Sequence, residues 1–280
     1  MFERLERGLE TVSECMDVLR SDKELLVFPL LSGLASMLVM ASFAGPIWWT
    51  GYAETLRQQK ELWDQPLVWA ISFAFYAINY FVILFFNSAL TGCAIIRFRG
   101  GNPTVSDGFQ IAVSRLPQIV SWALLGATVG MILKSLESRS EKAGKWASNI
   151  LGIVWSVATF FVVPVLVVEG VGPFDAVKRS SKVISEKWGE SFVADLGLGL
   201  ISLLAMSPFL ILLVVGIATL PSTNSRLPEI LIALAVGGMI LVSMASSTLD
   251  AIARTGLYMQ AVDEKYLARF DRMILSKQLD

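Results

Sequence analysis

The sequence contains no histidine and only two cysteines, Cys15 and Cys93, among its 280 residues. Zinc, haem and iron–sulfur centres need imidazole or thiolate ligands, and the common nucleophilic triads need a histidine base. This scarcity excludes most metal and nucleophile chemistry. We therefore expect no cofactor, no metal site and no enzymatic activity.

Charged residues are scarce and balanced, making up 17% of the chain with a net charge of -1. Chains that bind nucleic acid carry a basic excess on at least one face, so the balance predicts no nucleic-acid partner. What the chain has in abundance is apolar residues, at 54%, with a mean hydropathy of +0.61. That composition is typical of a membrane protein and not of a soluble globular domain.

Six stretches lack Asp, Glu, Lys and Arg over a length close to or above the roughly 20 residues that a helix needs to cross a bilayer. They run from Leu25 to Ala53, Gln65 to Ile96, Leu116 to Leu133, Trp146 to Val168, Leu196 to Ser225 and Ile230 to Leu249. Six such helices would leave a soluble protein without polar elements to cover them, and their apolar runs are continuous, unlike barrel strands. The sequence predicts an all-α, polytopic membrane bundle with six transmembrane helices, forming one integral membrane domain over residues 1–280.

The positive charges favour one side of this bundle. The N-terminal segment, the second and fourth connections and the C-terminus hold 16 of the 23 Lys and Arg residues, and the other three connections hold 7. Because positive charge is retained on the cytoplasmic side, we expect a multi-pass protein of the inner membrane with both termini cytoplasmic. The four cations from Lys134 to Lys145 run against this assignment.

Before each odd-numbered span lies an amphipathic stretch, which predicts three units of surface helix, span, loop and span over residues 1–100, 101–170 and 171–258, followed by a cytoplasmic tail at 259–280. Either Thr104 or Ser106 is expected to cap the second stretch. These helices either lie in the inner headgroup plane or cap the bundle. Their apolar stripes are Phe2, Leu5, Leu9, Val12, Met16 and Leu19; Val105, Phe109, Ala112, Val113 and Leu116; and Phe174, Val177, Ile184 and Trp188.

A few polar residues stand at or near membrane depth and are the candidate functional positions. Asp250 and Arg254 are spaced to pair along one helix face near the end of span six, and Asp195 stands at the start of span five. These charges mark either a polar entrance or the ordinary pairing of helix ends. Asn79 and Asn87 in span two either line a solute path or join helices by hydrogen bonds.

A proline interrupts span five. Pro208 removes one backbone donor and pushes on the carbonyl of Leu204, so we expect a kink there. A carbonyl freed in this way can coordinate an ion in transporters. Two broken spans in matching positions would be a stronger indication of such a site, and Pro164 lies too near the end of span four to match Pro208.

Four segments carry a resemblance to a known family: Met1 to Arg4, Leu19 to Gly33, Val165 to Gly170 and Ala176 to Ser180. They resemble a family of prokaryotic six-span integral membrane proteins of unknown function. That family is similar to the membrane domain attached to some glycerophosphoryl diester phosphodiesterases and to Yip-type bundles. The resemblance implies a six-span fold over nearly the whole chain and assigns no functional residue, since the histidines of the phosphodiesterase catalytic domain have no counterpart here.

Two functions compete at this point. The first is a non-enzymatic membrane protein that organises partners or shapes the inner leaflet, with the lipid bilayer and a membrane protein or second copy of the chain as partners. The alternative is a small-solute or lipid transporter or channel. A continuous polar cavity reaching Asn79 or Asn87 would favour transport, and a dry core would favour organisation.

Overall fold

The computed structural model describes residues 15–51, 55, 65–139, 143–220, 226–262, 264, 266–268 and 270–272, with backbone alone at 138, 139, 143, 144 and 187–196. All regular structure in these residues is helical, which confirms the all-α prediction. The elements are η1 (Lys23–Leu26), α2 (Val27–Trp49), α4 (Pro66–Phe98), α5 (Val105–Ser114), α6 (Leu116–Arg139), α7 (Ala143–Ala158), α8 (Val162–Glu169), α9 (Pro173–Thr219) and α10 (Leu227–Met259).

Six helical stretches are long and apolar enough to cross a membrane, which confirms the predicted number of spans. They coincide with the charge-free runs: Lys23–Trp49, Pro66–Phe98, Leu116–Glu137, Lys145–Glu169, Gly197–Thr219 and Leu227–Met259. Apolar side chains on these helices face outward, and Leu38 on α2 is 72% exposed. Outward-facing apolar surface of this extent is expected of helices that have lipid as their solvent.

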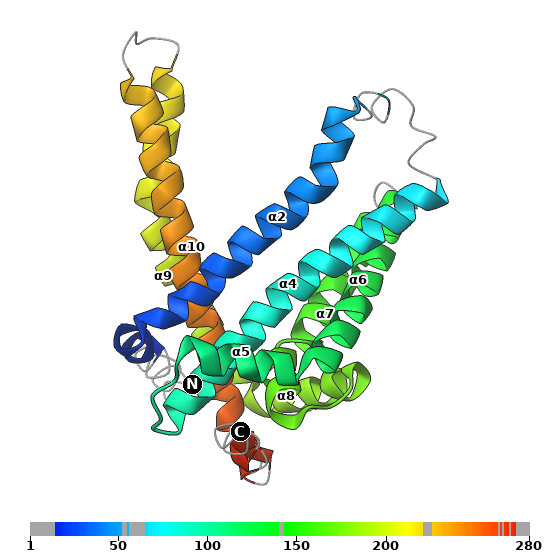
Figure 1. Ribbon diagram of the computed structural model, residues 1–280, viewed down its shortest axis with the longest axis vertical. Coiled ribbons are helices and arrows are strands. Elements are labelled where there is room, and N and C mark those ends of the chain that lie inside the picture. Colours follow the sequence, from blue (N-terminus) through cyan, green and yellow to red (C-terminus); the bar gives the residue numbers. More distant parts are fainter. Residues whose placement is uncertain are drawn as a thin grey trace.

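The helices converge at one end and diverge at the other (Figure 1). We call the converging end the base; it consists of η1, α5, α8, the first turns of α9 and the last turns of α4 and α10. Above the base, α9 packs along α10, while α4 packs against α2 and α6. Figure 1 shows α2 and the α9–α10 pair separating with distance from the base.

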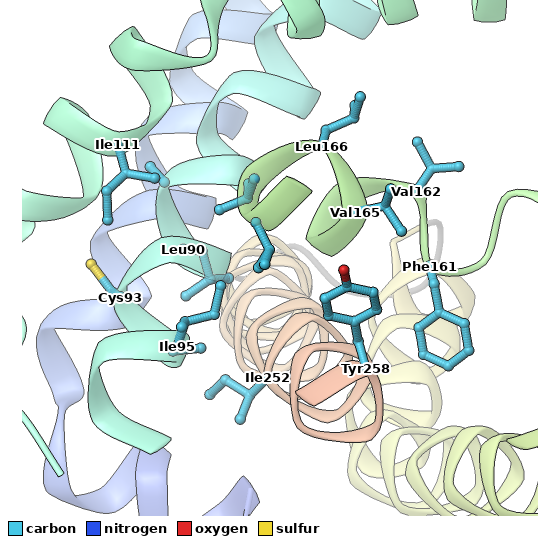
Figure 2. Close-up of a cluster of buried hydrophobic side chains, with 14 of the residues drawn as sticks. Leu90, Cys93, Ile95, Ile111, Phe161, Val162, Val165, Leu166, Ile252 and Tyr258 are labelled. Atoms are coloured by element: carbon cyan, nitrogen blue, oxygen red, sulfur yellow. The ribbon is translucent and has the colours of Figure 1, made fainter. Parts of the chain in front are cut away.

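The buried core lies in the base, and α8 is at its centre. Seven of the eight residues of α8 are buried, including Val165 and Val167 at 0% exposure. Leu90 and Ile95 of α4 and Ile252 of α10 surround it (Figure 2). Described residues of the predicted tail also pack here, because Phe270 is fully buried.

Ion pairs join the charged segments of the base. Arg97 at the end of α4 binds Asp22 through two nitrogens, and Arg99 binds Asp271 at 2.5 Å. These pairs bring together the N-terminal segment, the second connection and the C-terminal segment. The segments that the charge count assigned to one side of the membrane therefore lie at one end of the molecule (Figure 1).

The fourth predicted span is interrupted. Residues 159–161 form a turn between α7 and α8, and α8 lies across the base while α7 rises from it (Figure 1). In a continuous helix Pro164 would have no N–H to donate to the carbonyl of Phe160, and its ring would clash with that carbonyl. The apolar run from Trp146 to Val168 therefore folds as two helices and not as one continuous helix.

Where the structure describes them, the amphipathic stretches are helical, and their buried faces agree with the predicted stripes in part. Ala112 and Ile184 are buried, and Val105, Phe109 and Val177 pack against the core. Thr104 caps α5 in a reciprocal capping box with Asp107, which resolves the choice between Thr104 and Ser106. The buried face of α5 includes Ile111, while Val113 is 52% exposed. In the first turns of α9, Phe174 is 75% exposed and Ala176 is buried. Of the first stretch, residues 1–14 lie outside the described part of the chain.

Candidate functional site

A cavity of about 570 Å³ opens between α4, α6, the α7–α8 junction and α10, just above the base. Its polar lining residues come from four elements, and the rest of its wall is apolar. The polar ones are Tyr80, Asn87 and Thr91 of α4, Trp122 of α6, Ser156 and Thr159 at the junction, and Ser247, Asp250 and Arg254 of α10. The volume is within the range of small-molecule sites.

Two ionisable side chains of α10 face this cavity. Asp250 and Arg254 are one helical turn apart, and both line it. The guanidinium of Arg254 lies over the ring of Phe160, with 4.6 Å between the guanidinium carbon and the ring centroid. A cation over an aromatic face is stabilised by the ring quadrupole, so Phe160 helps to keep the guanidinium in this half-buried position.

The break between α7 and α8 forms one wall. The backbone N–H of Phe161 donates to the hydroxyl of Ser180 on α9 at 2.9 Å, and this bond is buried. The hydroxyl of Thr159 donates to the carbonyl of Trp155 at 2.8 Å. These bonds satisfy backbone groups at the break and place Ser156 and Thr159 against the cavity.

Aromatic rings close another side of the cavity. Trp122 of α6 is 1% exposed and stacks on Trp155 of α7, with 5.7 Å between ring centroids and 5° between planes. Tyr80 of α4 packs on Gly126, where a Cβ atom would collide with the phenol ring. The helix α6 can approach Tyr80 this closely because residue 126 is a glycine.

The structure brings three of the sequence candidates together and separates the others. Asn87 lines the cavity with Asp250 and Arg254, although α4 and α10 are far apart in sequence. Asn79 is half-buried and does not line the cavity. Asp195 belongs to α9, but its side chain is outside the described part of the structure.

At Pro208, the helix α9 continues through the proline. The hydroxyl of Ser207 donates to the carbonyl of Leu204 at 2.8 Å. That carbonyl is the one that Pro208 leaves without its helical donor. The carbonyl therefore accepts a hydrogen bond within its own helix, and the ion-site interpretation stays a prediction.

Sequence reasoning named Tyr80 beside Asn87 among the polar groups of span two, but it did not single out Ser156 and Thr159 for this cavity. A single serine or threonine in an apolar run does not by itself indicate a polar cavity. Its hydroxyl can donate to a carbonyl of its own helix and needs no polar neighbour. The sequence feature that could have indicated Ser156 and Thr159 was Pro164, which predicts a helix break next to them. Within the described residues, no group of three Asp, Glu or Cys side chains could hold a metal ion.

A helical bundle with six membrane-length helices and a polar cavity between them defines a polytopic membrane protein of α-helical type. Residues 67–267 match the model of a family of unknown function, DUF6159, and the chain belongs to that family. The matched segment contains every residue that lines the cavity. No curated protein matches the chain. The expected likeness to phosphodiesterase membrane domains and Yip-type bundles stays a prediction.

Proposed function

We propose that the chain is a non-enzymatic transporter that takes a small polar or amphipathic molecule into the cavity between α4, the α7–α8 junction and α10. The observation that carries the proposal is the meeting of Asn87, Asp250 and Arg254 in one cavity of about 570 Å³ between membrane-length helices. A polar cavity that reaches Asn79 or Asn87 is the feature that favours a transporter over an organising protein, and Asn87 lines this cavity.

The energetics of charge in a membrane support a binding role. Ionisable side chains within spanning helices are costly and persist where they face a polar cavity or each other. Asp250 and Arg254 meet the first condition. Asn87 and Ser156, which line the same cavity, add hydrogen-bonding groups.

The chemistry of the lining favours binding without catalysis. Of the described residues that line the cavity, Asp250 is the only one with a carboxylate, and none is a cysteine. General acid–base work on a bound substrate commonly uses two titratable groups of different pKa, and nucleophilic catalysis needs a base beside the nucleophile. We therefore propose that the cavity holds and releases its ligand unchanged.

A substitution that fills the cavity tests this function. Ser156→Trp places an indole in the cavity and should block it. In proteoliposomes, flux is measured over a panel of ions, amino acids and lipids, and the variant should lose at least about nine-tenths of the flux of the unsubstituted protein. Ser42→Trp adds the same side chain to an exposed position on α2 and should retain full flux. Background flux for the unsubstituted protein across the panel, or equal flux for both variants, would contradict the proposal.

We propose further that the base faces the cytoplasm of a cell with an inner membrane and that both termini are cytoplasmic. The support is the excess of Lys and Arg in the four segments that meet there. A reporter active only in the cytoplasm should be active when fused after Asp280 and inactive when inserted after Thr223. If the reporter is active only when inserted after Thr223, the topology is the opposite of the one proposed.

A second candidate function is the organisation of partners or of the inner leaflet. The observation that favours it is apolar exposure on the helices of the base, where Phe174 is 75% and Val113 is 52% exposed. The same proteoliposomes distinguish the two functions by their shape. Clustering or bending of vesicles that persists in Ser156→Trp and is lost when residues 1–20 are deleted would assign the protein to this second function.

A further inference from the structure

We propose that the cavity takes the headgroup of a zwitterionic phospholipid of the phosphoethanolamine type, while an acyl chain of that lipid lies in an apolar groove between α2 and α10. This inference rests on the proposed function and names its ligand class. It is carried by two hollows that lie along one face of α10 and share the lining residue Ser247.

The second hollow is a groove of about 350 Å³. Its wall is mostly apolar and comes from two helices that diverge above the base (Figure 1). A Cβ atom at Gly33 would meet nothing within 4 Å, so the α2 side of the groove is open. The lining residues are Pro29 and Gly33 of α2 and Val236, Met239, Ile240, Ser243, Met244 and Ser247 of α10.

Ser247 lines both the groove and the polar cavity. Residues three or four positions apart share one face of a helix, and the α10 residues of the two hollows follow this spacing. The face is apolar on the side away from the base and charged on the side near it. In order, it contains Val236, Ile240, Ser243, Ser247, Asp250 and Arg254.

A surface that is apolar along one stretch and charged at its end matches an amphiphile. A free polar solute would use the cavity and leave the groove unused. A free hydrocarbon would use the groove and leave the polar cavity unused. A lipid whose headgroup enters the cavity can use both hollows, because both are lined by Ser247.

The charge of the lining selects among lipids. Among the described residues that line the cavity, Asp250 and Arg254 are the only Asp, Glu, Lys or Arg, and together they give this lining a formal charge of zero. A planar guanidinium suits a phosphodiester, and a carboxylate suits a primary ammonium. A headgroup that carries both groups satisfies both side chains, whereas an anionic headgroup leaves Asp250 facing a like charge.

The experiment is native mass spectrometry of the full-length protein, delipidated in detergent and titrated with three probes: a phosphatidylethanolamine, a phosphatidylglycerol with the same acyl chains, and soluble glycerophosphoethanolamine, which has the same phosphodiester and ammonium without acyl chains. We expect the phosphatidylethanolamine to bind at least about tenfold more tightly than the phosphatidylglycerol, since a lost charged contact is worth about tenfold or more in affinity. We expect a margin of at least about tenfold over glycerophosphoethanolamine as well, since acyl methylene groups buried in the groove add a favourable transfer free energy that this probe lacks. Equal binding of the two lipids overturns the inference. Equal binding of glycerophosphoethanolamine and phosphatidylethanolamine assigns the site to a soluble headgroup and also overturns it.

Two charge variants make the test specific to the cavity. Asp250→Asn leaves the lining with a net positive charge and should reverse the preference toward phosphatidylglycerol, an outcome that a structural role of Asp250 would not produce. Arg254→Gln should weaken both lipids by about tenfold or more. The control Asp175→Asn, at an exposed position in the first turn of α9, should leave the preference unchanged. An unchanged preference in Asp250→Asn overturns the inference.

A third variant covers the case in which a charge variant fails to fold. Ile240→Trp fills the groove outside the cavity and should weaken the binding of phosphatidylethanolamine while leaving the binding of glycerophosphoethanolamine unchanged. Unchanged lipid affinity in this variant contradicts the acyl-chain assignment. If Ser156→Trp blocks the flux of a polar solute and the lipids bind without preference, the transport proposal survives and the lipid inference fails.

Discussion

Replacing Glu169 with alanine should lower the free energy of unfolding by about 3–5 kcal/mol, the range for removing one partner of a buried ion pair. The Glu169 side chain is 4% exposed, and its Oε1 atom accepts from Nε of Arg179 at 2.7 Å and from the hydroxyl of Tyr258 at 2.7 Å. Figure 2 shows the Tyr258 hydroxyl directed toward α8. The substitution therefore leaves a cation and a hydroxyl in the base without their acceptor.

The measurement is reversible unfolding in mixed detergent micelles, with helicity followed by circular dichroism. Tyr258→Phe removes one hydrogen bond to a charged group and should cost less, about 1.5–3 kcal/mol. Glu229→Ala, at an exposed position in the first turn of α10, should stay within about 0.5 kcal/mol of the parent protein. A loss below about 1 kcal/mol for Glu169→Ala would show that the network does not hold α8, α9 and α10 together.

Replacing Trp122 with alanine should destabilise the protein by about 3–5 kcal/mol, as expected when a large, fully buried aromatic side chain is truncated. Trp122 is 1% exposed, stacks on Trp155 and stands in the wall of the polar cavity. The stack joins α6 to α7, so its loss removes packing between two spanning helices. Packing of this kind drives helix association in lipid, where the hydrophobic effect between helices is absent.

Reversible unfolding in mixed detergent micelles also tests this prediction, with Trp146→Ala as the control. Trp146 is 73% exposed on α7, so its truncation should change stability by no more than about 0.5 kcal/mol. A double substitution of Trp122 and Trp155 should show a coupling of about 0.5–1.5 kcal/mol, the value for stacked aromatic pairs. Equal losses of stability for Trp122→Ala and Trp146→Ala would argue against a stabilising stacked contact between α6 and α7.

The candidate site illustrates why one sequence predicts only part of a membrane site. Asn79 and Asn87 have the same chemistry and lie in the same span, yet only Asn87 lines the cavity. The difference depends on where α10 crosses α4, and the hydropathy of either helix carries no information on that crossing. The spacing of Asp250 and Arg254 did predict a shared face, because both residues are on one helix and local geometry suffices.

The sequence by itself determined the number of spans and limited the cap of α5 to Thr104 or Ser106. Both follow from local free energies: the transfer of a long apolar run into lipid, and the satisfaction of N-terminal N–H groups by Thr104 and Asp107. Only the tertiary structure decided that the chain turns at residues 159–161, that α8 is buried and that Asn87 and Arg254 line one cavity. An apolar side chain has nearly the same transfer free energy against lipid as against another helix, so the choice of partner depends on shape, hydrogen bonds and ion pairs between distant segments.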